Sequence, residues 1–330
     1  MSENKGLLGS GLGMVARNKR YILWFWLLNL TLAEFGTAAF RKSAHAILDH
    51  SLGGDRLVHG FDFSVTINLI ARPEFGSMTA MTTPALYFAF LFLVLTALFL
   101  PGVFQGYAST YRLPREDFFR ACGRNLWRFI RLMVVAGVVM GIATAALFGL
   151  HGWLERKVAE STNELLLPEV RFAGLFVIFL VMTGFRIWFD LAETDIVLND
   201  QRAVRKSIWA GLRHALRSLI RLLSSYVVAA IVAAIILLGG LWAWMRFVAP
   251  ESVLGAFVVA QLTLLLLLIP RFWQRGIAVA YWKREMMLPV VAPQPTIPQP
   301  IVPPPAPVVA APVSVAEPTV PETPPETHGP

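Results

Sequence analysis

The sequence predicts an all-α integral membrane protein with six transmembrane helices, basic amphipathic interfacial helices and a disordered, proline-rich C-terminal tail, on three observations. Hydrophobic residues make up 56% of the 330 residues and charged residues only 15%, whereas about 25% of the residues of soluble domains are charged. Several uncharged stretches reach the length of about 20 residues that crosses a bilayer. The final 42 residues contain 15 of the 22 prolines, a composition typical of disordered segments with polyproline II character.

Uncharged stretches define four of the spans. They lie between Glu74 and Arg112, Arg131 and Glu155, Arg221 and Arg246, and Glu251 and Arg271. The apolar segment 21–40 is a fifth span although it contains Glu34. The segment 172–191 is a sixth, with Arg186 and Asp190 near its end. The predicted spans are therefore 21–40, 85–104, 132–150, 172–191, 222–244 and 253–270.

These spans divide the chain into a cytoplasmic N-terminal arm (1–20), a six-helix membrane domain (21–288) and a cytoplasmic proline-rich tail (289–330). With the N-terminus inside, the inner segments carry 20 basic residues and the outer ones carry 8. Because Lys and Arg accumulate on the cytoplasmic side, both termini are expected in the cytoplasm. Arginine outnumbers lysine by 23 to 6, which is typical of a GC-rich bacterial genome and indicates the bacterial inner membrane.

A cleavable signal peptide is the alternative for the first span. Basic residues precede its apolar run, and Ala44-His45-Ala46 resembles a small-residue cleavage site. Glu34 and the two charges Arg41 and Lys42 just before that site argue against cleavage. We therefore expect the first helix to be retained.

Two cytoplasmic segments carry arginines at every fourth position, which places them on one face of a helix. These stripes are Arg120, Arg124 and Arg128, and Arg213, Arg217 and Arg221. Each segment also has an apolar side, so we expect both helices to lie in the headgroup plane and contact anionic phospholipid. The alternative is that the arginines only fix the topology. Since they flank spans and belong to no soluble domain, no nucleic acid partner is expected.

The two basic segments also align with each other at an offset of about 90 residues, counted on the sequence. Each leads directly into a long apolar span. A duplicated unit and a shared basic-amphipathic composition both explain this agreement, and the sequence leaves the two open.

Charged residues at membrane depth are costly and are candidates for function. Glu34 lies two turns from Arg41, and Arg186 and Asp190 are four residues apart on one helix face. An internal ion pair is the expectation for the second set. A proton or substrate role for Glu34, Arg186 and Asp190 is the basis of a transporter alternative.

No motif for a catalytic group, cofactor or metal is found. The histidines and aspartates of the outer loop 41–84 match no ligand signature, and a single cysteine, Cys122, permits no disulfide within the chain.

The segment 190–213 carries a resemblance to a known group of proteins. A span that ends in small and acidic residues is followed by a short turn and by Ala203-Val-Arg-Lys-Ser207, which opens a basic helix. This resembles bacterial multi-span proteins similar to the membrane domain attached to some glycerophosphodiester phosphodiesterases. The resemblance covers about 21–288, and it implies an all-helical membrane module. No phosphodiesterase barrel is attached, so no catalytic activity and no functional residue carries over.

The expected function is a non-enzymatic scaffold or accessory module that contacts the lipid bilayer, its anionic phospholipid headgroups and a protein partner of the proline-rich tail. A small transporter is the alternative, and a lipid enzyme is the third class. Transporters often interrupt spans with Gly or Pro near the midplane. We predict that Pro84, Pro101 and Pro270 lie at span ends, which favours the scaffold.

Overall fold

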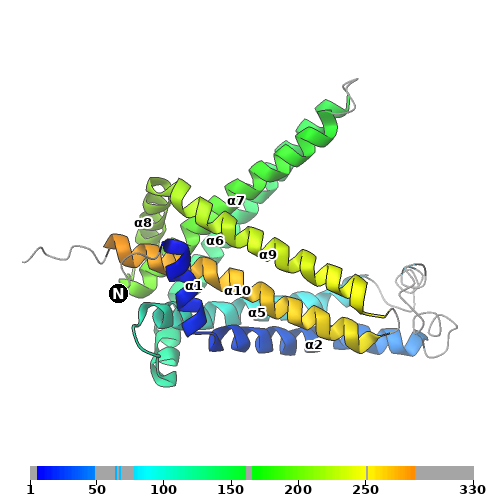
Figure 1. Cartoon of the computed structure of the whole chain (residues 1–330), viewed down its shortest axis with the longest axis horizontal. Coiled ribbons are helices and arrows are strands. Elements are labelled where there is room, and N and C mark those ends of the chain that lie inside the picture. Colours follow the sequence, from blue (N-terminus) through cyan, green and yellow to red (C-terminus); the bar gives the residue numbers. More distant parts are fainter. Residues whose placement is uncertain are drawn as a thin grey trace, which may run out of the picture. The chain divides into compact units, whose positions relative to one another are not determined.

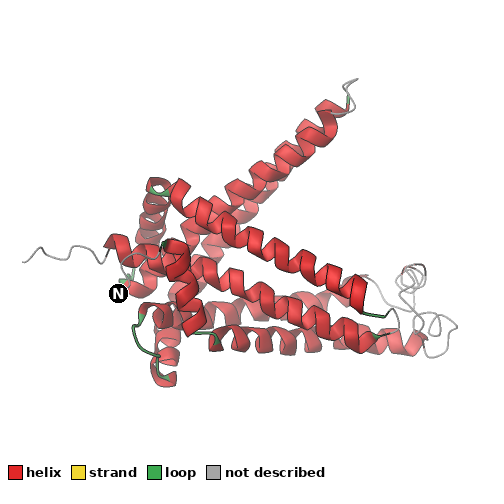
Figure 2. Cartoon of the chain, in the orientation of Figure 1, coloured by secondary structure: helices red, strands yellow, loops and turns green. Residues whose placement is uncertain are grey.

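The computed structural model describes residues 6–48, 64, 67, 78–160, 166–249 and 252–286. All regular structure in these ranges is helical, and they contain no strand (Figure 2). The predicted proline-rich tail, 289–330, lies outside the described residues. So does the outer loop between 49 and 77, apart from Ser64 and Ile67.

Among the described residues, the first half of the chain contributes four helices, labelled in Figure 1. They are α1 (Leu7–Arg17), α2 (Arg20–Leu48), α5 (Met78–Ala108) and α6 (Arg115–Ala159). Helix α6 begins directly after Pro114, and Glu116 and Asp117 lie in its first turn. Carboxylates there complement the positive end of the helix dipole, which favours a helix start at this point.

The second half contributes four more. They are α7 (Leu166–Leu198), α8 (Val204–Arg217), α9 (Leu219–Phe247) and α10 (Val253–Met286). Asp200, just beyond α7, has φ 48°, a left-handed conformation that Asp tolerates better than most residues and that commonly ends helices. The chain therefore turns sharply between α7 and α8.

Among the described residues, five helices are long and apolar enough to cross a membrane. They are Leu86–Ala108 within α5, then α6, α7 and α9, and Val253–Glu285 within α10. Each coincides with one of the predicted spans, so the prediction of an all-helical protein with several helices of membrane-spanning length and apolarity is confirmed. The remaining prediction, 21–40, falls on α2, which has 29 residues but contains Asn29 and Glu34 and is not one of the five.

Several helices continue beyond the boundaries that the sequence predicts. Pro270 lies inside α10 and Pro101 inside α5, so neither proline ends its helix. The first basic segment is likewise no separate interfacial helix, because α6 runs unbroken for 45 residues from Arg115 through the apolar span. Burial explains α10: Phe272, Tyr281 and Trp282 beyond the proline are almost fully buried, which offsets the lost backbone hydrogen bond.

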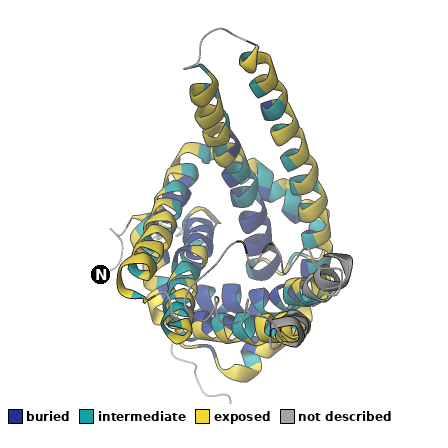
Figure 3. Cartoon of the chain, turned by 90° about the vertical axis from the view of Figure 1, so that its right-hand side faces the viewer, coloured by how far each residue is buried: buried dark blue, intermediate teal, exposed yellow. Residues whose placement is uncertain are grey.

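The buried side chains gather at one end of the helices, the end predicted to be cytoplasmic. The largest come from the start of α2, the end of α5, the start of α6 and α9, and the end of α10, and include Tyr21, Tyr107, Phe118, Phe129, Tyr226 and Trp282. The opposite halves are mostly exposed (Figure 3). Phe172, Leu238 and Val253 are exposed there although they are apolar, as expected of surfaces that lipid covers.

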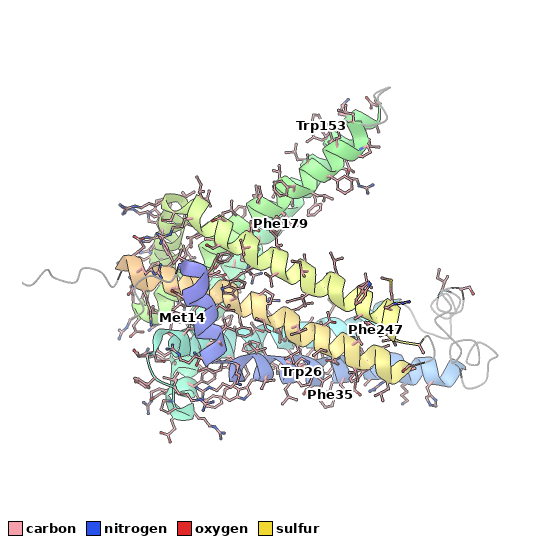
Figure 4. All side chains as sticks on the ribbon, in the orientation of Figure 1. Met14, Trp26, Phe35, Trp153, Phe179 and Phe247 are labelled. Atoms are coloured by element: carbon pink, nitrogen blue, oxygen red, sulfur yellow. The ribbon has the colours of Figure 1, made fainter. Side chains whose placement is uncertain are left out.

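The two ends of the helix set differ in how closely the helices pack. Helices α6 and α7 pack against each other, and together they diverge from α9 (Figure 1). Trp153 and Phe247, near the outer ends of α6 and α9, lie well apart in Figure 4. The helices thus converge in a protein core at the end predicted to be cytoplasmic and separate toward the other end.

The N-terminal arm is also helical and belongs to this core. Helix α1 packs on α10 where Gly11 meets Gly276. A Cβ added at Gly276 would lie 2.7 Å from the Gly11 carbonyl oxygen, so glycine is required for the close approach of the two backbones. The sequence reading of 1–20 as a polar arm missed this contact.

Candidate functional site

A charged cluster lies where α7, α9 and α10 meet, at the closely packed end of the helices. Arg186 Nε is 3.8 Å from Asp190 Oδ2, so the ion pair that the sequence predicts is present. The Tyr226 hydroxyl donates a 2.8 Å hydrogen bond to the same carboxylate oxygen. Gln274 Nε2 in turn donates to the Tyr226 carbonyl oxygen at 3.3 Å. Asp190 therefore links α7 to α9, and Gln274 extends the network to α10.

The cluster contains more cations than anions. Glu193 and Arg275 are each more than nine-tenths buried, and Glu193 lies in electrostatic reach of Asp190, Arg186, Arg271 and Arg275. Two carboxylates thus face three guanidinium groups. Of the three guanidinium groups, Arg271 is exposed and Arg186 is 35% exposed, so the excess positive charge of this cluster is accessible to an anion.

Two pockets adjoin the cluster, and Arg271 borders both. The smaller, about 240 Å³, lies between α7, α9 and α10 and is lined by residues that include Phe179 (labelled in Figure 4), Thr183, Arg186 and Gln274. The larger, about 440 Å³, lies between α2, α5 and α10. Its polar lining residues are Trp26, Asn29, Thr96, Gln261, Arg271 and Arg275.

Glu34 takes no part in this cluster. Its Oε1 atom is 2.5 Å from Nη1 of Arg41, which lies two turns further along α2, and both side chains are more than half exposed. Glu34 lines neither of the two pockets. The structure therefore does not bring Glu34 together with Arg186 and Asp190, as joint use in transport would require.

The arginines of the first stripe form ion pairs with acidic residues of the protein itself. Arg128 Nη1 lies 2.6 Å from Asp200 Oδ1, and Arg124 Nε lies 3.9 Å from the same atom. Arg120 pairs with Asp117 at 2.9 Å. The hydrogen bond from Arg128 lowers the pKa of Asp200 below its ordinary value, and the charges of Arg124, Arg128 and Arg202 add to that effect. The prediction that this stripe contacts lipid overlooked Asp200, whose position depends on the turn after α7.

The second stripe is divided between two helices. Arg213 and Arg217 lie in α8, are exposed, and form no ion pair within the part of the chain that the structure describes. Arg221 belongs to α9 and lies 3.7 Å from Glu285. Of the six arginines predicted to contact lipid, Arg213 and Arg217 are thus the two without an acidic partner among the described residues.

Helix α8 contacts α7 through its small residues. Ser207, Gly211 and Ala215, four residues apart, are buried, and a Cβ added at Gly211 would lie 2.8 Å from the Trp188 carbonyl oxygen. Trp188 Nε1 donates a 2.7 Å hydrogen bond to the Ile208 carbonyl oxygen. The helix is therefore attached to α7 along a narrow face of small side chains.

Two large apolar residues of α8, Trp209 and Leu216, point away from the protein. Trp209 and Leu216 are 68% and 64% exposed, on the side of the helix that also carries the exposed Arg213 and Arg217. Helix α8 thus presents one surface, here called the α8 face, made of Trp209, Arg213, Leu216 and Arg217. Aromatic, aliphatic and basic side chains together are typical of helices at a membrane surface.

His214 lies at the edge of α8, where its surroundings lower its pKa. Burial lowers the pKa of His214, and the charges of Arg213 and Arg217 lower it further. Its ring centroid is 5.1 Å from that of Trp282. The charge of the α8 face therefore comes from arginine and is independent of pH in the physiological range.

The described residues contain no group of three or more His, Cys, Asp or Glu side chains placed to hold a metal ion. The predicted site residues include only Arg186 and Asp190 of this cluster, and not Glu193, Tyr226, Arg271, Gln274 or Arg275. Tyr226 had a recognisable signal, since it is a polar aromatic residue in an otherwise apolar span. Gln274 had no such signal, because its role depends on how α10 packs.

In comparisons with known proteins, the chain matches no family model, no curated protein and no solved structure.

Proposed function

We propose that this protein is a non-enzymatic inner-membrane module, a scaffold or accessory protein, that engages anionic phospholipid through the α8 face. The observation that carries the proposal is the exposure of Trp209 and Leu216 beside Arg213 and Arg217, which have no acidic partner among the described residues. An exposed tryptophan and leucine are costly in water. Insertion at the membrane surface removes that cost while the guanidinium groups reach the phosphates.

The proposal includes a topology. Helix α2 is the sixth span, both termini are cytoplasmic, and α8 lies on the cytoplasmic side just before the span of α9. The positive-inside distribution of Lys and Arg supports this orientation. The proline-rich tail is then available to a cytoplasmic protein partner.

A matched pair of double variants tests the lipid preference. Each basic residue near an anionic surface contributes about 1 kcal/mol, so R213Q with R217Q should lower the preference for phosphatidylglycerol over phosphatidylcholine by at least about tenfold. The control, R120Q with R124Q, removes the same charge on the same predicted side, but its arginines pair with Asp117 and Asp200. Native mass spectrometry of the detergent-solubilised protein, incubated with both lipids, gives the ratio bound. Equal losses in the two variants would contradict a specific role for the α8 face.

The transporter alternative draws on one observation, the position of Pro270 inside the unbroken helix α10 beside Arg271, since a proline inside a helix leaves a backbone carbonyl group without its helical hydrogen bond. The exposed Glu34–Arg41 pair does not support it.

A further inference from the structure

The larger pocket combines a mostly apolar lining with several polar groups that have no partner. It is bounded by α2, α5 and α10 and has a volume of about 440 Å³, within the range of small-molecule sites. Thr96 Oγ1, Trp26 Nε1 and Arg275 Nε all lack a hydrogen-bond partner, and all three residues line this pocket. Thr96 and Arg275 are each 7% exposed.

Unpaired polar groups of this kind are rare in the interior of proteins. Each buried donor or acceptor without a partner costs about 1–3 kcal/mol. The described residues contain nine such side-chain atoms in all, and three of them surround one pocket. A ligand that accepts hydrogen bonds from Thr96, Trp26 and Arg275 would remove the cost at all three.

The charge of the pocket selects the sign of the ligand. Arg271 and Arg275 line it, whereas Asp190 and Glu193 do not. The surrounding cluster also has three guanidinium groups for two carboxylates. An anionic group is therefore favoured at the inner end of the pocket, and a cation is disfavoured.

The length of the pocket indicates the rest of the ligand. Its lining on α10 extends from Gln261 to Arg275, and 14 residues of helix rise about 21 Å. Between these two positions the α10 lining is leucine and phenylalanine apart from Arg271, and Ala33 and Leu30 face it from α2. A chain of methylene groups matches this wall, and it would run parallel to the helices.

We propose that this pocket binds one acyl chain of an anionic amphiphile. The carboxylate or phosphate lies at Arg271 and Arg275, and the apolar chain lies between α2 and α10. The same chemistry comes from two sources, a free fatty-acid-like molecule and an anionic phospholipid. The site is separate from the α8 face, so the two proposals stand or fall independently.

The test uses the full chain in nanodiscs of phosphatidylcholine and a photoactivatable dodecanoate as the probe. We expect crosslinks, mapped by mass spectrometry, on α2 and α10 peptides, and protection by excess laurate. Dodecanol, which has the same chain but no charge, should protect at least about tenfold more weakly. Equal protection by laurate and dodecanol would overturn the anionic part of the proposal.

Variants locate the site. A33F fills the pocket and should abolish the protected crosslink, whereas A38F introduces the same side chain on the same helix away from the lining and should leave it unchanged. R271Q should weaken protection by laurate about tenfold and T96V by a few-fold, because each removes a partner of the head group. T96V conserves the shape of the side chain, so it tests the site even if A33F fails to fold. Unchanged labelling in A33F and T96V would overturn the site.

A final arm distinguishes the sources. Nanodiscs that contain phosphatidylglycerol should lose the dodecanoate crosslink if a phospholipid occupies the pocket, and they should keep it if the occupant is a free amphiphile. Either result supports the site. Crosslinks that are confined to other helices in both nanodiscs would overturn it.

Discussion

At the scale of single residues, Asp200 connects the turn between α7 and α8 to helix α6. Its left-handed conformation ends α7, and its carboxylate receives Arg128 from α6 at 2.6 Å just before α8 begins. An exposed ion pair is worth little by itself. Here the pair also fixes the turn that positions α8, so its effect reaches beyond the two side chains.

The pH dependence of stability tests this contact. Because Arg128 lowers the folded-state pKa of Asp200, the unfolded chain binds more protons between the two values, and stability rises with pH there. The contribution is fully present above the unfolded value of about 3.9 and is lost as pH falls through the lower folded value. D200N keeps a residue that tolerates the left-handed conformation. We expect a lower thermal midpoint than wild type at pH 7 and a difference that shrinks below about pH 4. A difference independent of pH would contradict the ion pair.

The pair of Arg186 and Asp190 gives a second prediction at this scale. D190L leaves Arg186 without its nearest carboxylate and the Tyr226 hydroxyl without its acceptor, at a cost of roughly 1–3 kcal/mol for each unpaired group. Replacing both partners with apolar residues removes the charge imbalance. We therefore expect D190L to lower the yield of folded protein, measured by size-exclusion chromatography, more than R186L with D190L does. Adding Y226F to the double variant should recover more.

If R186L with D190L lowers the folded yield more than D190L alone does, the two charged residues have a role other than structural pairing. A double variant worse than the combined single variants would favour the transporter alternative.

At the scale of elements, the long apolar helices were predictable and their ends were not. Uncharged stretches identified four of these helices, and the apolar segment that precedes Arg186 identified the fifth, because a bilayer requires length and apolarity, which are local properties of the sequence. Pro270 was expected to end a span, yet α10 continues because Phe272 and Trp282 are buried against other helices. That burial is a property of the assembled core, so no local pattern announces it.

The two basic segments show the same limit. Both carry arginines at every fourth position, but one is the start of the unbroken α6, whereas the other is a separate helix that ends at Ser218. The hydroxyl groups of Ser218 and Tyr281 lie 3.0 Å apart, so a contact with α10 accompanies the break. The pairing of Arg124 and Arg128 with Asp200 likewise depends on tertiary structure, because it joins α6 to the turn after α7. Of the predicted site, the Arg186–Asp190 pair could be predicted from sequence alone, because a spacing of four residues on one helix places both side chains on the same face.

At the scale of the whole molecule, the described residues form a packed core at one end of the helices and separated apolar halves at the other. This arrangement suits a bilayer, where lipid would cover the apolar halves and, in the proposed orientation, the core would adjoin the cytoplasm. Fusions to a reporter active only in the periplasm test the orientation. We expect activity after Gly60 and Ser161 and silence after Gly123, Gly211 and Pro330. An active fusion at Pro330 would contradict six spans.

The depth of the α8 face in the membrane tests the central claim most directly. A nitroxide is attached to W209C or L216C in a background with C122A, and to R112C as an exposed control outside α8, in vesicles that contain phosphatidylglycerol. Collisions with oxygen, which concentrates in lipid, and with a water-soluble nickel complex report immersion. The account predicts that labels at 209 and 216 collide mainly with oxygen, whereas the label at 112 collides mainly with nickel. Nickel collisions at 209 and 216 as frequent as at 112 would contradict it.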